Sequence, residues 1–154
     1  MVKQGRLVGA RVSIGNKEEM LQQLAVSLAE HFSNASLFQA NHEAFRDRAT
    51  VDEAKARELD SLILQVDERR ALREAQARGE DVQIKERRMD PLDTYDPTAL
   101  RMQRDKHLRQ AEEFRKRSLE EADKAQDSRK AAEDTQRKII ETRAAKDEYF
   151  DLRR

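Results

Sequence analysis

The chain has 154 residues, of which 40% are charged and 37% hydrophobic, and it contains no tryptophan. Its 31 basic and 31 acidic residues cancel, so no net charge favours nucleic acid or an anionic membrane as a partner. Such a polar chain buries little apolar area per residue, which argues against a thick, self-contained core. With four glycines, two prolines and intermingled charges, the composition predicts helices rather than disorder.

Two further features of the sequence limit its class. There is no cysteine, which excludes disulfides and cysteine-based metal sites. No apolar run approaches the roughly 20 residues of a membrane span, and the first residues lack the apolar region of a signal peptide. We therefore expect an intracellular protein that binds neither membrane nor nucleic acid.

Residues 1–15 form an arm that differs from the rest, since they hold three of the four glycines and no acidic residue. Val8, Ala10, Val12 and Ile14 alternate with period two, as in a half-buried strand that would need a partner's sheet. A mitochondrial presequence and a flexible tail remain as alternatives.

Residues 16–79 predict a helical hairpin. Asn16 and Glu19 have the spacing of a capping box, and Thr50 and Glu53 repeat it. We expect an interruption at Ser33-Asn34 and a second helix from Thr50. Apolar stripes run along both helices: Leu21, Leu24, Leu28, Ala35, Phe38 and Phe45 in the first, and Val51, Leu59, Leu62, Ile63 and Val66 in the second.

Residues 80–96 connect this hairpin to the rest of the chain and contain both prolines. Pro91 excludes Asp90 from helical geometry and so ends whatever precedes it. Asp96 followed by Pro97 is a strong helix start, with the aspartate as N-cap and the proline in the first turn. The segment predicts a rigid elbow.

Residues 97–152 predict one long charged helix. A heptad register places Leu100, His107 and Phe114 on one line and Ala111, Ser118 and Ala125 on its companion, with only Ala, Ser, Thr and Glu in the middle. A strong two-stranded coiled coil requires Leu or Ile along both lines, so we do not expect one. Acid-then-base pairs at i,i+4 would stiffen the helix instead: Glu112–Lys116, Glu113–Arg117, Glu120–Lys124, Glu133–Arg137 and Asp134–Lys138. The expected fold is all-α and extended, with little independent core.

Motifs for chemistry are absent from the sequence. It has no HExxH, no phosphate-binding loop and no nucleophile elbow, and its three histidines are too far apart to share a metal. We expect no catalytic residue, no metal and no cofactor. A basic cluster around Arg101–Arg109 is diluted by acids and lacks the aromatic side chains that stack on bases, so it fits an acidic protein surface better than nucleic acid.

The scattered large apolar side chains of the C-terminal half are candidate contacts with a protein partner. Packing back onto the hairpin is the alternative for Leu100–Leu119, but a hairpin arm of about 30 residues spans only about 45 Å and leaves the distal residues uncovered. The candidate partner-binding residues are Tyr95, Leu100, Met102, Phe114, Ile139, Ile140, Tyr149 and Phe150.

The segment Y-D-P-T-A-L-R-M-Q (Tyr95–Gln103) opens a charged helix that ends D-E-Y-F-D-L-R-R. This pattern resembles the small helical cilia- and flagella-associated proteins that line the lumen of axonemal doublet microtubules. The resemblance covers about the last 60 residues. It implies a non-enzymatic microtubule inner protein that binds tubulin and neighbouring inner proteins and stabilises the doublet of a cilium or flagellum. A helical subunit of another intracellular complex, for instance a mitochondrial one, and a self-associating coiled-coil adaptor are the alternatives.

Overall fold

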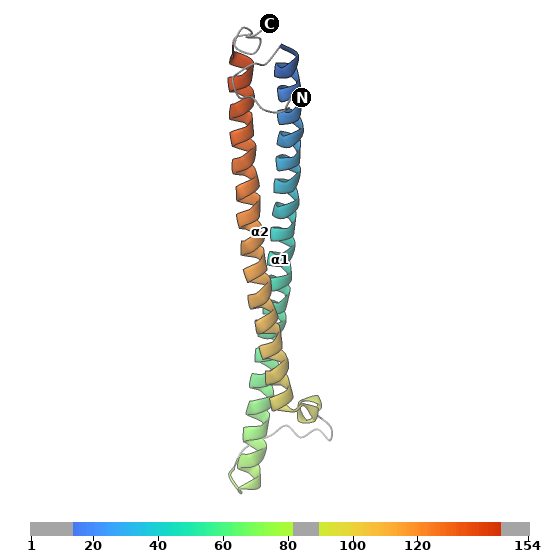
Figure 1. Cartoon of the computed structure of the whole chain (residues 1–154). Coiled ribbons are helices and arrows are strands. Elements are labelled where there is room, and N and C mark those ends of the chain that lie inside the picture. Colours follow the sequence, from blue (N-terminus) through green and yellow to red (C-terminus); the bar gives the residue numbers. More distant parts are fainter. Residues whose placement is uncertain (1–13, 82–89, 146–154) are drawn as a thin grey trace. The chain divides into compact units, whose positions relative to one another are not determined.

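The computed structural model describes residues 14–81 and 90–145, in which the chain forms two long helices and one short one (Figure 1). Helix α1 spans Ile14–Ala77, the 3₁₀-helix η2 spans Pro91–Thr94, and helix α2 spans Pro97–Ala144. The all-α prediction is confirmed. The predicted strand-like arm lies almost wholly outside the described residues, as does the end predicted for the long helix at residue 152.

The hairpin predicted for residues 16–79 is wrong, because these residues belong to a single helix that continues without a break from Ile14 to Ala77. Helix α1 begins two residues before Asn16, the predicted cap. Thr50 does not cap a second helix either: its hydroxyl donates to the carbonyl oxygen of Arg46, 3.1 Å away and one turn earlier. A threonine satisfied in this way is compatible with a helix interior. Ser33 and Asn34, where an interruption was expected, lie on the exposed side of α1. Polar side chains on that side of a helix do not interrupt it.

The C-terminal end of α1 is set by Gly79, which is also where the predicted helical segment 16–79 ends. Its φ of 84° lies in the left-handed region. The Gly79 amide donates to the Gln76 carbonyl and the Glu80 amide to the Ala75 carbonyl, at 3.0 and 3.1 Å. These two bonds are those of a Schellman motif, which satisfies the last carbonyls of the helix.

Replacing Gly79 by alanine is expected to destabilise this helix end by about 1 kcal/mol, because a Cβ is disfavoured at positive φ. No atom would clash with the added methyl group, so backbone strain is the whole effect. Hydrogen exchange should show faster exchange of the Gly79 and Glu80 amides. Replacing the exposed Gln76 by alanine should leave these amides unchanged, and protection that is unaltered in the Gly79 variant would contradict the assignment.

Both Asp-Pro pairs have the local geometry that the sequence predicts, whereas the 3₁₀-helix η2 between them was not predicted. Asp90 has extended backbone geometry and its carboxylate accepts a hydrogen bond of 2.9 Å from the Leu92 amide, which caps η2. Asp96 caps α2 in the same way, accepting from the Thr98 amide at 3.1 Å. The arginine fork of Arg69, on α1, donates to both carboxylate oxygens of Asp93 at 2.8 and 3.2 Å. The elbow is therefore fastened to α1 by a bidentate ion pair.

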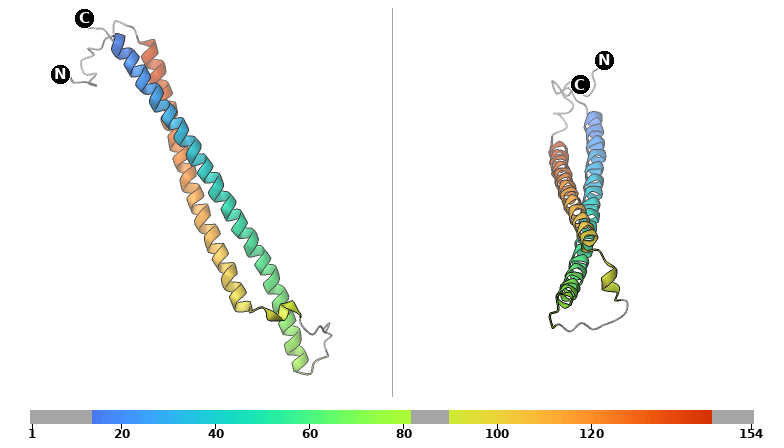
Figure 2. Two further views of the ribbon diagram at one scale, coloured as in Figure 1. Left: turned by 90° about the vertical axis from the view of Figure 1, so that its right-hand side faces the viewer. Right: turned by 90° about the horizontal axis from the view of Figure 1, so that it is seen from below.

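Contacts divide the chain into two units. Unit 1 consists of residues up to His42 together with Glu120 and the residues that follow it, and unit 2 is Glu43–Leu119. In both units a segment of α1 lies beside a segment of α2, as the views in Figures 1 and 2 agree. In each unit, earlier residues of α1 contact later residues of α2, and later residues of α1 contact earlier residues of α2. The two segments therefore run antiparallel.

Unit 2 contains the aliphatic core of the described chain. Ile63, Val66 and Leu100 are buried against one another, with Leu59, Leu62 and Leu92 packed around them. The apolar stripe predicted for residues 59–66 is thus confirmed as a buried face. Its partners are α2 and η2, however, and not an earlier part of α1. Val51, assigned to the same stripe, is exposed.

In unit 1 the two helices meet through small side chains. Ala125 and Ala132 of α2 are almost fully buried and Thr135 and Thr142 nearly so, with Ala35 buried on α1. These α2 residues belong to the heptad lines that seemed too weak for a coiled coil. Small side chains at these positions let two helix backbones approach closely, since interaxial distance depends on the contacting residues. The prediction that the distal part of the long helix lies alone is therefore wrong.

One carboxylate interrupts this small-residue contact. Glu121 is buried in unit 1, where its Oε1 accepts a 2.8 Å hydrogen bond from the Asn41 side chain of α1. Its other oxygen pairs with Lys124 Nζ at 2.9 Å. The hydrogen bonds from Lys124 and Asn41 hold the pKa of Glu121 below its ordinary value. Both oxygens are thus partnered, which is the condition for burying a carboxylate.

Candidate interaction surfaces

The predicted partner-binding residues do not form one surface. Met102 and Ile140 are strongly exposed, at 67% and 65%, and Tyr95 is just exposed. Leu100 is instead buried in the core of unit 2, and Phe114 and Ile139 are half-buried. Tyr149 and Phe150 lie outside the described residues. Leu100 is corrected from a partner contact to an internal one, because it packs on Ile63 and Val66 of α1. Phe114 contacts Phe45 of α1 but is only half-buried.

The basic cluster on α2 is largely neutralised inside unit 2. Arg101 pairs with Asp67, and Arg104 and Asp60 lie 3.0 Å apart. His107 Nδ1 lies 2.9 Å from a buried carboxylate, Asp52. In the fourth such pair, Arg115 Nε donates to Glu53 at 2.8 Å. In all four pairs α1 supplies the acid and α2 the base, so the cluster favours the antiparallel register more than an external anion.

The five i,i+4 pairs predicted to stiffen α2 form only in part. Arg117 pairs with Glu113 at 3.3 Å, as predicted. Lys124 pairs with Glu121 and Arg137 with Asp134, both at i,i+3 and not at i,i+4. The exposed pairs Arg117–Glu113 and Arg137–Asp134 contribute a few tenths of a kcal/mol each, so the packing of α2 on α1 is the larger stabilising effect.

Unit 2 has an aromatic cluster that the sequence patterns did not reveal. The rings of Phe45 on α1 and Phe114 on α2 stack with their centroids 6.1 Å apart. The guanidinium of Arg48 lies 5.7 Å from the centre of the Phe114 ring, and that of Arg117 lies 6.0 Å from the centre of the Phe45 ring. Each helix therefore contributes a phenylalanine and, three residues later, an arginine that covers the other helix's ring.

An internal repeat in the sequence could have identified this Phe–Arg cluster. Glu43–Ala49 reads E-A-F-R-D-R-A and Glu112–Ser118 reads E-E-F-R-K-R-S. Phenylalanine, arginine and the final small residue occur at matching places, and the small residues Ala49 and Ser118 are both buried. Two similar segments thus pack antiparallel, each one presenting the same chemistry to the other.

A groove beside the Phe–Arg cluster reaches the surface. It is lined by Asp47, Arg48, Val51, Asp52 and Phe114. Val51 is exposed at 53%, and Phe114 is only half-buried. Among the described residues Arg48 has no carboxylate partner, since its contact is with the ring. The groove therefore combines apolar side chains with one cation, Arg48, and two carboxylates, Asp47 and Asp52.

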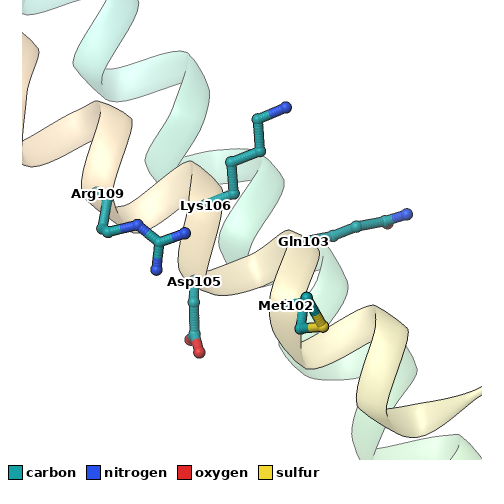
Figure 3. A pocket seen from close by; sticks show the side chains of 5 residues that line it. All are labelled: Met102, Gln103, Asp105, Lys106 and Arg109. Atoms are coloured by element: carbon teal, nitrogen blue, oxygen red, sulfur yellow. The ribbon is translucent and has the colours of Figure 1, made fainter.

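A second hollow lies on α2 alone. Figure 3 shows its lining side chains, Met102, Gln103, Asp105, Lys106 and Arg109, all of which come from this helix. Lys106 and Gln103 extend to one side, whereas Met102 and Asp105 extend to the other. Because one helix supplies every side chain, nothing encloses a small ligand, and enclosure is what such a site requires.

Unit 1 presents an uncharged face that sequence reasoning also missed. Between Met20 and His42 the only charged residue is Glu30, although 40% of the whole chain is charged. Val26 and Leu37 are exposed at 59% and 56%, and Phe32 is exposed as well. The low number of charged residues between Met20 and His42 would have revealed this face. The spacing of the apolar residues identified only the buried side of the segment.

Acid is expected to destabilise unit 2 through its paired carboxylates. The hydrogen bond from Arg69 lowers the pKa of Asp93, and that from Arg115 lowers the pKa of Glu53. A carboxyl group with a lowered pKa in the folded state stabilises that state above its unfolded pKa. This stability is lost as the pH falls from about 5 through the lowered values. Thermal unfolding followed at stepwise lower pH measures the loss.

The matched variant for this test carries Asp93→Asn and Glu53→Gln. It should melt lower than the parent at pH 7 and depend less on pH below about 5, because the two linked groups are gone. Equal pH dependence in parent and variant would show that other carboxylates cause the acid effect.

Within residues 14–81 and 90–145 no group of three or more His, Asp or Glu side chains is placed to hold a metal ion. None of the helices described is both long and apolar enough to cross a membrane. Comparison with protein-family models, with curated proteins and with solved structures gave no match for this chain.

Proposed function

We propose that this chain is a non-enzymatic structural protein that acts as a helical component of a larger protein assembly. The observation that carries the proposal is the Phe–Arg cluster of unit 2 with its adjoining groove. Arginine and aromatic residues dominate the binding energy of protein interfaces, especially where an apolar pocket adjoins them. Here Arg48, Val51 and the half-buried Phe114 provide that combination on the surface.

The distribution of other exposed apolar residues in unit 2 supports an assembly with several neighbours. Val51 and Leu64 project from different sides of α1, since 13 residues place them about 140° apart on a helix. Met102 and Leu108 of α2 are separated by about 120° in the same way. One flat partner would cover only one of these directions, whereas a chain enclosed by several partners would use them all.

Within this class we propose a microtubule inner protein of ciliary or flagellar doublets, bound to tubulin and neighbouring inner proteins. The support is the resemblance of Tyr95–Gln103 to the small helical proteins of the doublet lumen. Asp96, Pro97 and Leu100 of this segment begin α2, and Tyr95 and Met102 beside them are exposed. The segment therefore has side chains free to contact a neighbour.

Crosslinking of the native protein with identification of the linked peptides tests the proposal, because the partner defines the function. Links from Lys55 and Lys106, both exposed in unit 2, to tubulin or to other doublet proteins are expected. The protein should also remain with axonemes in high salt and be released when the doublets dissolve. Recovery in a mitochondrial fraction, or links to enzymes of one pathway only, would contradict it.

The groove itself is tested with Val51→Glu. Burying the added carboxylate beside Asp47 and Asp52 should abolish partner binding, because an unpaired charge at an interface is costly. Leu72→Glu is the control, since Leu72 is also exposed in unit 2, at 41%, and does not line the groove. Both variants should keep the circular dichroism of the parent; loss of helix in the Val51 variant would mean that the side chain has an internal role.

A further inference from the structure

The uncharged face of unit 1 is directed away from α2. The side of α1 that faces α2 carries residues that are half-buried or buried, including Leu21, Leu28 and Ala35. The opposite side carries exposed residues spaced three or four apart. These residues, which we call the neutral stripe, are Gln22, Val26, Ala29, Ser33, Leu37 and Ala40.

About Ser33 the neutral stripe places a large side chain at the same distance on one side as a small side chain on the other. Val26 lies seven residues before Ser33 and Ala40 seven after it. Ala29 lies four before and Leu37 four after. If the stripe meets its own copy in the opposite direction, with Ser33 on a two-fold axis, Val26 lies against Ala40 and Leu37 against Ala29. Each large residue then meets a small one, which is what close packing of two helices requires.

We propose that the neutral stripe binds the neutral stripe of a second copy of this chain, so that two α1 helices pair antiparallel about Ser33. The contact is isologous, since both chains use the same residues, as in most two-fold dimers. It goes beyond the proposed function and does not depend on it, because the groove of unit 2 is not involved.

Charge favours a second copy over other occupants. An acidic or basic partner would be matched by opposite charges, and the stripe has none. Glu30, the one charged residue nearby, meets Ser36 and not Glu30 of the second copy in this register. Between residues 20 and 46 no like charges are therefore opposed in this register.

The oligomeric state of the full chain tests the proposal. Sedimentation equilibrium over micromolar to millimolar concentrations should give a monomer–dimer equilibrium. Val26→Glu combined with Leu37→Glu should weaken dimerisation at least about tenfold, since two charges would be buried against alanines. The pair Leu64→Glu and Leu119→Glu, equally exposed in unit 2, is the matched control and should dimerise like the parent. A monomer at all concentrations, or a dimer that survives the stripe variant, overturns the proposal.

Cysteine crosslinking tests the register. The chain has no cysteine of its own, so a single substitution reports one position. Ser33→Cys should give a disulfide-linked dimer under mild oxidation, because the two-fold axis brings residue 33 of both copies together. Lys130→Cys, exposed on α2 in unit 1, should crosslink far more slowly. Equal rates at the two positions would overturn the antiparallel pairing, and so would a Ser33→Cys variant that stays monomeric.

Discussion

Replacing Leu100 by alanine is expected to destabilise unit 2 by about 3 kcal/mol, which urea denaturation would show as a lower midpoint. Leu100 is 6% exposed and packs on Ile63 and Val66, the latter almost fully buried. Truncation removes buried apolar contacts and leaves a cavity that two rigid helices cannot close. In so polar a chain this cluster supplies most of the aliphatic burial that unit 2 has, so its loss is a large effect.

Met102 provides the control, because it lies two residues away on the same helix and is 67% exposed. Met102→Ala should change the unfolding free energy by less than about 0.5 kcal/mol, since alanine and methionine have similar helix propensities. If Leu100→Ala and Met102→Ala had equal effects, Leu100 would be a surface residue. It would then return to the partner contacts that the sequence predicted.

Replacing Ala125 by leucine is expected to destabilise unit 1 by about 1–3 kcal/mol. Ala125 is fully buried between α1 and α2, and a leucine there would force the two helices apart. Sequence reasoning alone predicts the reverse, because leucine at a heptad position strengthens an ordinary coiled coil. The sign of the change therefore distinguishes close packing through alanine from a loosely filled coiled coil.

Gln126→Leu is the matched control, since it adds a leucine at the neighbouring, exposed position of α2. Its effect on the unfolding midpoint should be small. A higher midpoint for Ala125→Leu than for the parent would show that space exists between the helices, and the small residues of α2 would then need another explanation.

The local structure near the prolines and Gly79 followed from sequence because it depends on neighbouring residues only. Asp96 caps α2 and Gly79 ends α1, as their types and positions indicate, and Asp90 stays outside helical geometry as the proline after it requires. The prediction that was wrong is the helical hairpin at residues 16–79. A capping pattern such as Thr50 with Glu53 is equally compatible with a helix interior, and the choice depends on whether a second helix supports the whole length.

The candidate surfaces were predicted less well than the fold. Tyr95, Met102 and Ile140 are exposed as expected, whereas Leu100 lies in the core. The heptad spacing of apolar residues does not show whether they face a helix of the same chain or a helix of a partner. The Phe–Arg cluster needed two segments from distant parts of the chain, and the neutral stripe needed knowledge of which side of α1 faces α2.

The sequence by itself determined that this protein is helical, that one helix ends near Gly79 and another begins after Asp96, and which lines of residues form the apolar faces. These properties depend on propensity, capping and periodicity, all of which act over a few residues. Only the tertiary structure decided that the weak heptad lines of α2 pack on α1. That outcome depends on how closely two helices approach when alanine, serine and threonine lie between them, and it is a property of the pair and of neither helix alone.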